Sequence, residues 1–249
     1  MASDTSSTSL SSALLTSLLA LVFGFLGAAV WSFSGLADNR TRAYLIDNPD
    51  VLPLMAEKLQ EQEQSARLAE AGEDVFRVFP GAVLGNPQGT KTLVEFTDYN
   101  CPYCEKSLKD VESLIAADPQ LKVIVREWPI FDGSEVASRM ALAAALQGKY
   151  SEFHKKLFEL GPVTPESIEA VEQAARTIGI DMERARRDMV SDSVNVEIAR
   201  NGALARTIGF SGTPAWVTGD KALAGAVGFE TLKEAVETAG PIATGEEQS

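Results

Sequence analysis

The sequence predicts an α/β fold in which two strand-containing segments are separated by a long helical insertion. A β-α-β pattern occupies residues 92–127, and a β-β-α pattern occupies residues 215–239. Between them, residues 134–208 show helical patterning and no convincing strand. The predicted organisation is, in order, a membrane anchor or signal segment over 1–37, a helical stalk over 38–74, a domain over 75–240 and a disordered tail over 241–249.

The composition is that of a globular protein, and it argues against a nucleic-acid-binding protein and against a small disulfide-stabilised scaffold. Hydrophobic residues make up 45% and charged residues 23% of the chain. The net charge of −13 argues against nucleic acid as a partner, because no basic stripe is present to neutralise phosphates. Two cysteines are too few for a small scaffold held together by disulfides.

The first hydrophobic segment, residues 13–31, carries no charge. Together with residues 32–35 it is long enough for a bilayer core, which needs about 20 apolar residues. The preceding residues contain no Lys or Arg, so we expect an uncleaved anchor with Trp31 and Phe33 at the interface. A cleaved signal peptide, cut near residues 35–37, is the alternative. Arg40 and Arg42 follow the segment and weakly favour the orientation that would keep the rest of the chain in the cytoplasm, because positive charges are retained on that side.

The stalk, residues 38–74, is polar and predicted to be helical. One interpretation is a solvated spacer. The other is a homo-oligomerisation segment, because Leu45, Leu52 and Leu59 lie seven residues apart. Two prolines interrupt this short repeat, so both interpretations stay open.

The first half of the domain contains the clearest elements. Short strands are predicted at 75–78 and 82–84, and the strongest strand, at 92–99, is rich in β-branched and aromatic residues. A helix over 102–117 ends at Asp118-Pro119. Residues 121–127 alternate between apolar and polar and predict a second strand, parallel to the first through a right-handed crossover.

The second half begins with the insertion. Glycines at positions 148, 161 and 179 are placed as helix C-caps within it. Strands are then predicted at 215–217 and 223–227, followed by a last helix over 229–239.

The motif Cys101-Pro102-Tyr103-Cys104 contains the only cysteines of the chain and lies between a predicted strand and a predicted helix. A C-x-x-C in this context indicates a thiol–disulfide redox centre. Pro102 suits the first helical position. The Cys101 sulfur then faces free N–H groups at a helix N-terminus, which favour the thiolate, so we expect Cys101 to be the nucleophile. Cys104, one turn later, should be less exposed and should resolve mixed disulfides.

Other uses of these cysteines are weaker predictions. A zinc site needs four ligands, whereas the chain offers two Cys and His154, so no metal and no cofactor are predicted. His154 lies in the insertion, far in sequence from the cysteines, and is expected to be structural. A purely structural disulfide that closes so short a loop would add little stability.

Three features together carry a resemblance to a known family. The segment FTDYNCPYC, the long helical insertion and the later GFSGTPAWV resemble the DsbA-like branch of the thioredoxin superfamily. The segment RAYLIDNPDVLPLMAEKL is similar to that of the Com1 and ScsC copper-sensitivity proteins. The resemblance covers about residues 43–239. It implies a thioredoxin fold with an inserted all-helical subdomain.

The resemblance also implies a client-binding surface. It implies a cis bond between Thr213 and Pro214, in a loop that packs opposite the C-x-x-C and presents its backbone to the client. Pro102 and Tyr103 are expected to contact the client as well. The sequence departs from the strongly oxidising members, which carry His in place of Tyr103 and usually Val in place of Thr213. We therefore expect a less oxidising couple, and the direction of electron flow stays open.

Glu95 lies six residues before Cys101 in an otherwise apolar strand, where the family often places a buried acid. Burial raises the pKa of a carboxyl group, and such a group can exchange a proton with Cys104. The alternative is a strand-end glutamate that reaches solvent.

These observations predict a periplasmic thiol–disulfide oxidoreductase, anchored in the inner membrane or secreted after signal cleavage, since disulfides persist outside the cytoplasm. It would form or isomerise disulfides in cysteine-containing client proteins and depend on a membrane redox-recycling partner. The alternative is a membrane-tethered chaperone or copper-handling module, because soft thiolates suit copper(I). A cytoplasmic reductase is disfavoured by the hydrophobic N-terminus.

Overall fold

The computed structural model describes residues 7–33, 36–164 and 167–240, with side chains placed over 14–28, 40–164 and 167–240. Contacts divide the chain into two units, Met1–Gln60 and Glu61–Ser249. The predicted tail over 241–249 lies outside the described residues.

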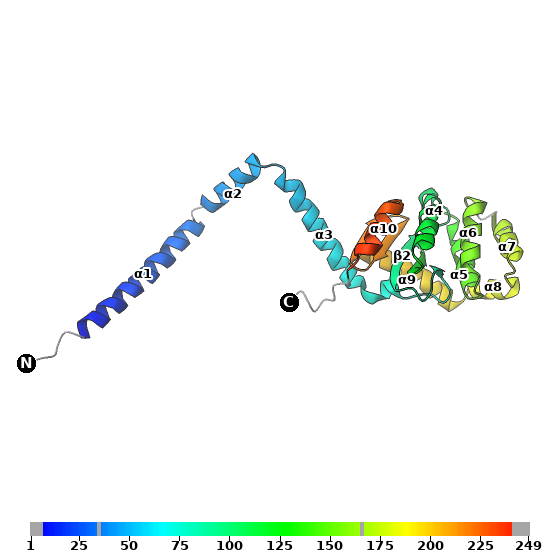
Figure 1. Cartoon of the computed structure of the whole chain (residues 1–249), viewed down its shortest axis with the longest axis horizontal. Coiled ribbons are helices and arrows are strands. Elements are labelled where there is room, and N and C mark those ends of the chain that lie inside the picture. Colours follow the sequence, from blue (N-terminus) through cyan, green and yellow to red (C-terminus); the bar gives the residue numbers. More distant parts are fainter. Residues whose placement is uncertain (1–6, 34–35, 165–166, 241–249) are drawn as a thin grey trace, which may run out of the picture. The chain divides into compact units, whose positions relative to one another are not determined.

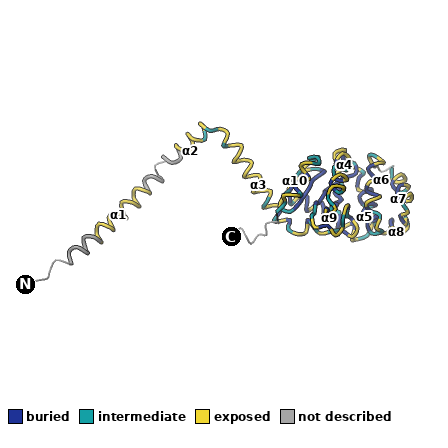
Figure 2. The backbone as a smooth tube through the Cα atoms, viewed as in Figure 1, coloured by how far each residue is buried: buried dark blue, intermediate teal, exposed yellow. Residues whose placement is uncertain are grey.

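The first unit is helical. It contains α1 (Ser7–Phe33), α2 (Leu36–Asp47) and the first part of α3 (Val51–Ala71). Most of its described side chains are exposed (Figure 2). Across the described part of the chain, no helix is long and apolar enough to cross a membrane. The anchor predicted over 1–37 is therefore not supported; residues 1–6 and 34–35 of that segment lie outside the description.

A five-stranded mixed sheet forms the centre of the second unit, in the order β1-β3-β2-β4-β5. Inner strands β2 and β3 are parallel, as predicted, with Glu95 opposite Val125 and Thr97 opposite Glu127. The remaining pairs are antiparallel. The strands are β1 (Val83–Gly85), β2 (Lys91–Thr97), β3 (Leu121–Glu127), β4 (Ala215–Thr218) and β5 (Lys221–Ala224).

Helices cover both faces of this sheet. The predicted insertion is confirmed as helical in its described residues, and α6, α7 and α8 lie at the end of the unit remote from α10 (Figure 1). The helices are α4 (Pro102–Ala117), α5 (Ser134–Ala145), α6 (Tyr150–Leu160), α7 (Ile168–Thr177), α8 (Met182–Met189), α9 (Asp192–Ile208) and α10 (Phe229–Thr238), with a 3₁₀ helix, η1 (Gly72–Phe76), before the sheet.

Two hydrophobic cores result from the alternation of side chains along the strands. On one face, Leu93 and Val125 pack with α4, α10 and the insertion. On the other face, Phe96 and Ile124 pack with α9 and with the end of α3, where Leu68 is 1% exposed. Because α3 is buried there, residues 61–74 belong to the second unit, although the sequence placed the start of the domain at residue 75.

The predicted strand at 75–78 is wrong. This segment contains the end of η1 and an extended stretch, and its carbonyl groups face a buried side chain instead of a neighbouring strand. The Arg126 guanidinium is 0% exposed. It donates to the carbonyl oxygens of Asp74, Val75 and Arg77 and to the side chains of Glu197 and Asn201, at 2.6–3.2 Å.

Two other strands are displaced from their predicted positions. The strand expected at 82–84 begins one residue later. The strand expected at 223–227 begins at Lys221, because a tight turn at Gly219 (φ +50°) returns the chain directly from β4. Gly225 then adopts φ +85° as the chain leaves the strand.

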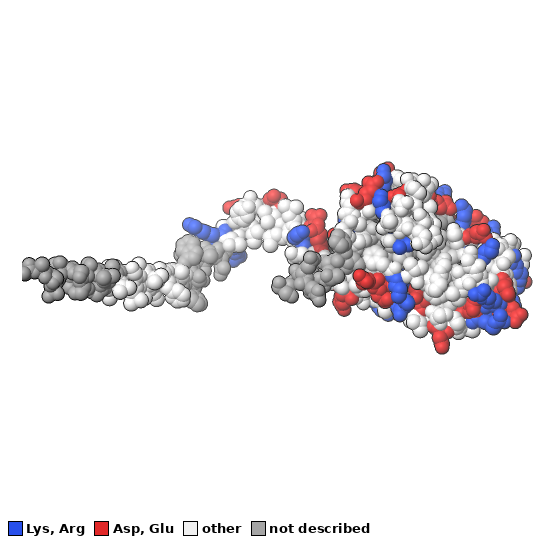
Figure 3. Space-filling view, turned by 60° about the horizontal axis from the view of Figure 1, so that its bottom comes forward, with Lys and Arg blue, Asp and Glu red and all other residues white. Residues whose placement is uncertain are grey.

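On the face seen in Figure 3, acidic and basic side chains are interspersed over the second unit.

Candidate active site

The redox motif lies where β2 gives way to α4. Cys101 is the N-cap of α4, with extended backbone angles (φ −87°, ψ 115°), and Pro102 opens the helix, as predicted. The Cys101 carbonyl oxygen accepts from the amides of Cys104 and Glu105 at 3.0 and 3.2 Å. The first turn of the helix therefore places Cys104 one turn behind Cys101.

The loop before β4 lies against Cys101. The Thr213–Pro214 peptide bond is cis, as the family resemblance implied. The Cys101 thiol donates to the Thr213 carbonyl oxygen over 3.1 Å. The structure thus brings together residues that are 112 positions apart in the sequence.

Both cysteines are free thiols and both are buried. Cys101 is 2% exposed and Cys104 is 0% exposed, so the expected contrast in exposure is slight, because the Thr213 loop covers Cys101. Between them, Pro102 is exposed and Tyr103 is 62% exposed. The two side chains between the cysteines therefore lie at the surface, whereas both thiols are buried.

Glu95 lies behind the cysteines on the inner strand β2. It is 2% exposed, so the prediction of a buried acid is confirmed and the solvent-reaching alternative is wrong. Burial, and then the nearby charge of Glu127, raise the pKa of Glu95 from 4.5 to about 8. Burial, and then the charge of Glu95, raise the pKa of the Cys104 thiol well above its usual range. Glu95 and Cys104 are therefore electrostatically coupled.

Asp98, which sequence analysis missed, organises the chain just before the motif. Its side chain is fully buried and accepts from the amides of Ile130 and Phe131 at 2.6 and 3.0 Å, and from the Ser134 hydroxyl at 2.8 Å. Its other oxygen accepts from the amide of Asn100 at 2.7 Å. The signal that could have identified it is an acid directly after an apolar strand, three residues before the first cysteine.

Asn100 ties the motif to the insertion. Its amide group donates to the carbonyl oxygens of Asp132 and Val163 at 2.9 and 2.7 Å. Its carbonyl oxygen accepts from the Val163 amide at 2.6 Å. Val163, in the segment that follows α6, is thereby held beside the redox centre.

A third buried acid, Glu127, lies at the end of β3 and was also missed by sequence analysis. Its Oε1 accepts from the hydroxyls of Tyr99 and Tyr150 at 2.8 and 2.6 Å. Burial raises the pKa of Glu127 from 4.5 to about 7, and these hydroxyls oppose the shift. His154, as expected, is buried in a packed helix; its Nδ1 lies 2.9 Å from the Tyr99 hydroxyl, and burial lowers its pKa to about 3.

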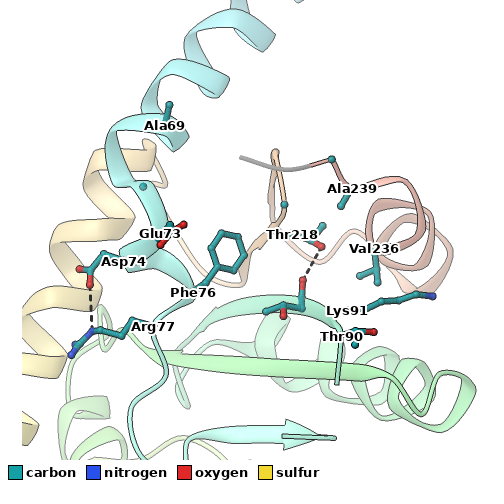
Figure 4. Close-up of a pocket in the computed structure, with 14 residues that line it drawn as sticks. Ala69, Glu73, Asp74, Phe76, Arg77, Thr90, Lys91, Thr218, Val236 and Ala239 are labelled. Carbon is teal, nitrogen blue, oxygen red and sulfur yellow. Dashed lines mark hydrogen bonds and ion pairs between the residues drawn. The ribbon is translucent and has the colours of Figure 1, made fainter. Parts of the chain in front are cut away.

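A cavity of about 1020 Å³ is lined by neither cysteine (Figure 4). Phe76, Lys91, Thr218 and Val236 line it. Lys91 begins β2, whereas the motif follows the other end of that strand, a separation of about 20 Å along seven strand residues. Within the described residues, no group of three or more His, Cys, Asp or Glu side chains is arranged to hold a metal. The predicted nucleophile, Cys101, therefore lies away from this cavity.

Comparisons with known proteins agree with this geometry. The family described as "DSBA-like thioredoxin domain" matches residues 92–237. A thioredoxin-like oxidoreductase from Silicibacter pomeroyi is 42% identical, with a TM-score of 0.62 over 67% of this chain and 95% of that one. A ScsC variant from Proteus mirabilis is 25% identical, with a TM-score of 0.66 over 83% of this chain and 94% of that one.

Curated relatives differ in how much of their length is matched. "Disulfide bond formation protein D" of Bacillus subtilis is 26% identical over 62% of this chain and 75% of its own length. The first curated relatives are Na⁺/H⁺ antiporters of Salinispora, and the match spans only 24% of their length. The similarity to these antiporters is therefore confined to one part of them.

Proposed function

Because the chain belongs to the DSBA-like thioredoxin domain family, we propose that it is a thiol–disulfide oxidoreductase that forms or isomerises disulfides in client proteins. The contact between the Cys101 sulfur and the Thr213 carbonyl oxygen, 3.1 Å, carries this proposal. It joins the helix N-terminus that holds the nucleophile to the loop that would present backbone to an extended client. Pro102, Tyr103 and Pro214 complete that client-binding surface in the proposal.

In the oxidising direction, the motif starts as a Cys101–Cys104 disulfide. A client thiolate attacks the Cys101 sulfur, the disulfide breaks, and Cys104 leaves with the electron pair and gains a proton. A second client thiolate then attacks the client sulfur of the mixed disulfide and releases Cys101. Two electrons pass from the client to the two cysteines, and the client gains one disulfide. Isomerisation uses the same mixed disulfide, but starts from the Cys101 thiolate.

The proposal is tested by replacing both cysteines. Cys101→Ala/Cys104→Ala should reduce insulin disulfides, with dithiothreitol as electron source, no faster than dithiothreitol alone, while the native protein accelerates the reaction. Ser113→Ala, an exposed position on α4, is the matched control and should keep native activity. If the double variant keeps native activity in this assay, the proposed redox centre is wrong. If the native protein shows none but retains binding to a reduced client, a chaperone-type binding module replaces the proposal.

Repeated turnover needs a partner that restores the motif. After each oxidation both cysteines are thiols, so a further oxidant must accept two electrons before the next cycle. We propose a membrane redox protein as that partner and a location outside the cytoplasm, because there disulfides persist. An alkaline phosphatase fusion, active only after export, tests the location.

The first unit also supports self-association as a proposal. Leu52 and Leu59 of α3 are 53% and 56% exposed, and Ile46 of α2 is 67% exposed. We propose that these side chains pack against those of other copies of the chain. Burying a fully exposed side chain of this kind contributes about 1.5–3 kcal/mol, so burial of these three in each copy would favour association.

Leu52→Glu/Leu59→Glu should therefore lower the mass measured by light scattering to that of a single chain. Gln60→Glu/Gln62→Glu adds the same charge at neighbouring exposed polar positions and should leave the mass of the native assembly unchanged. A native protein that is already a single chain at tens of micromolar would refute the proposal.

A further inference from the structure

Two buried acids face the same side of the central sheet beside the redox motif. Thr97 of β2 lies opposite Glu127 of β3, and Glu95 lies two residues before Thr97. Side chains at i and i+2 of a strand share a face, so Glu95 and Glu127 point to the same core. Glu95 is 2% and Glu127 is 0% exposed. Two carboxyl groups in such a site resist ionising together, and one of them keeps its proton to a higher pH.

Hydrogen bonds to one of its two oxygens favour Glu127 as the acid that carries the charge. Glu127 Oε1 accepts from two tyrosine hydroxyls, and hydrogen bonds donated to a carboxylate favour its charged form. Tyr99 has a single hydroxyl proton, which it donates to Glu127, so in its 2.9 Å contact with His154 the Tyr99 oxygen is the acceptor. The neutral His154 ring then carries its proton on Nδ1. Burial raises the pKa of both carboxyl groups, and at Glu127 the hydroxyls of Tyr150 and Tyr99 oppose this rise.

We propose that Glu127 is a positioning residue that keeps a proton on Glu95 near neutral pH, so that Glu95 can donate this proton to the Cys104 sulfur when the disulfide opens. The proposal rests on the thiol–disulfide function proposed above. It favours the oxidising direction, because an uncharged Glu95 can donate a proton to the leaving thiolate but cannot accept one from the Cys104 thiol.

The path of the proton involves three groups: the Cys104 sulfur, Glu95 and Glu127. When a client thiolate breaks the Cys101–Cys104 bond, Cys104 leaves as a thiolate and takes the Glu95 proton. The pKa of a thiol is ordinarily about 8.5. Burial and the charge of Glu95 raise it at Cys104, above the pKa of about 8 at Glu95, so the proton moves to sulfur. Glu95 is left as a carboxylate beside the charged Glu127, and this repulsion drives uptake of a new proton from solvent.

The titratable groups facing Glu127 come from three parts of the fold. Glu95 belongs to β2. Asp98 and Tyr99 follow that strand, and the charge of Asp98 raises the pKa of Glu127. Tyr150 and His154 belong to α6. At neutral pH the Tyr99 and Tyr150 hydroxyls and the His154 ring are uncharged, since burial raises the pKa of both tyrosines and lowers that of the histidine.

Infrared spectroscopy of the reduced full-length protein tests the coupling directly. The band of a buried protonated carboxyl group disappears as it ionises, and Glu95→Gln identifies the Glu95 band. In Glu127→Gln, the midpoint for Glu95 should fall by about one pH unit or more, because a like charge has been removed nearby. Glu112→Gln, which removes an exposed acid from α4, is the matched control and should not move it.

A second variant protects the test against loss of folding. Tyr150→Phe removes one hydroxyl from Glu127 Oε1 and keeps the ring in the core. It should weaken the Glu127 anion and move the Glu95 midpoint downward, by less than Glu127→Gln does. The proposal is overturned if either Glu127→Gln or Tyr150→Phe folds and the pH midpoint for Glu95 ionisation is the same as in the native protein.

Activity separates this proposal from the proposed function. The alkaline limit of client oxidation should move downward together with the infrared midpoint in Glu127→Gln. If the midpoint moves but the native protein exchanges no disulfides, the proposed function fails, and the role of Glu95 as donor to Cys104 is overturned with it. If exchange occurs and its pH limit stays fixed while the midpoint moves, the donor role alone is overturned.

Discussion

Cys104→Ser is expected to trap the client as a mixed disulfide, whereas Cys101→Ser is expected to abolish covalent capture. The Cys101 sulfur lies at the N-terminus of α4 against the Thr213 loop, where an incoming client would reach it first. Cys104 is fully buried one turn behind, so it can attack Cys101 but is hidden from the client. Without Cys104, the bond between the client and Cys101 has no internal thiol to break it.

Mass spectrometry after incubation with two peptides joined by one disulfide measures this difference. Cys104→Ser should gain close to one peptide per chain, while the other peptide leaves as a thiol, and dithiothreitol should remove the adduct. Cys101→Ser should gain none above the level of the double variant. An adduct on Cys104 in the Cys101→Ser protein would reverse the assignment of nucleophile and resolving thiol.

The second large effect concerns stability. Arg126→Ala should lower the free energy of unfolding by about 3–5 kcal/mol, the usual cost of breaking a buried ion pair by removing one partner. The variant would remove the 3.0 Å partner of Glu197 Oε1, leaving this carboxylate, 3% exposed, paired only through Oε2 with Arg77 and Arg200. It would also leave three main-chain carbonyl groups without their donor. Urea denaturation followed by circular dichroism measures the change.

Two further variants show whether burial causes the loss. Lys156→Ala breaks a 2.8 Å pair with Glu159 in which the side chains are 40% and 50% exposed, and should cost less than about 1 kcal/mol. Arg126→Met/Glu197→Leu removes both buried charges and should recover part of the stability lost in Arg126→Ala. A loss in Arg126→Ala no greater than that in Lys156→Ala would contradict the expectation.

Local signals predicted much of the fold. The helix over 102–117 and the strand over 121–127 have the bounds expected from the sequence, because Pro102, Asp118-Pro119 and the β-branched run define them locally. The strand expected at 75–78 failed for a non-local reason. The carbonyl groups of Val75 and Arg77 accept from the Arg126 side chain, about fifty residues later, and neither residue lies in a strand.

Sequence analysis predicted the site residues that lie close to Cys101 in the sequence. Glu95 stood out as an acid within an apolar strand that leads to Cys101. Glu127 did not, because alternation along 121–127 makes a final glutamate look like a solvated strand end. Its burial depends on Tyr150, which α6 brings from 23 residues away. Arg126 and Glu127 are adjacent in the sequence, and each is 0% exposed. Their side chains point to opposite faces of the same inner strand, and the sequence alone does not show that both faces are covered.

The contacts of Asp98 and Asn100 have a consequence for protein engineering. These side chains, just before the first cysteine, hold the start of α5 and the segment after α6. The helical insertion is therefore not an interchangeable module. A chimera that grafts a foreign insertion onto this chain without matching acceptors for Asn100 would leave the nucleophile's own loop untethered, even if every strand and both thiols were kept.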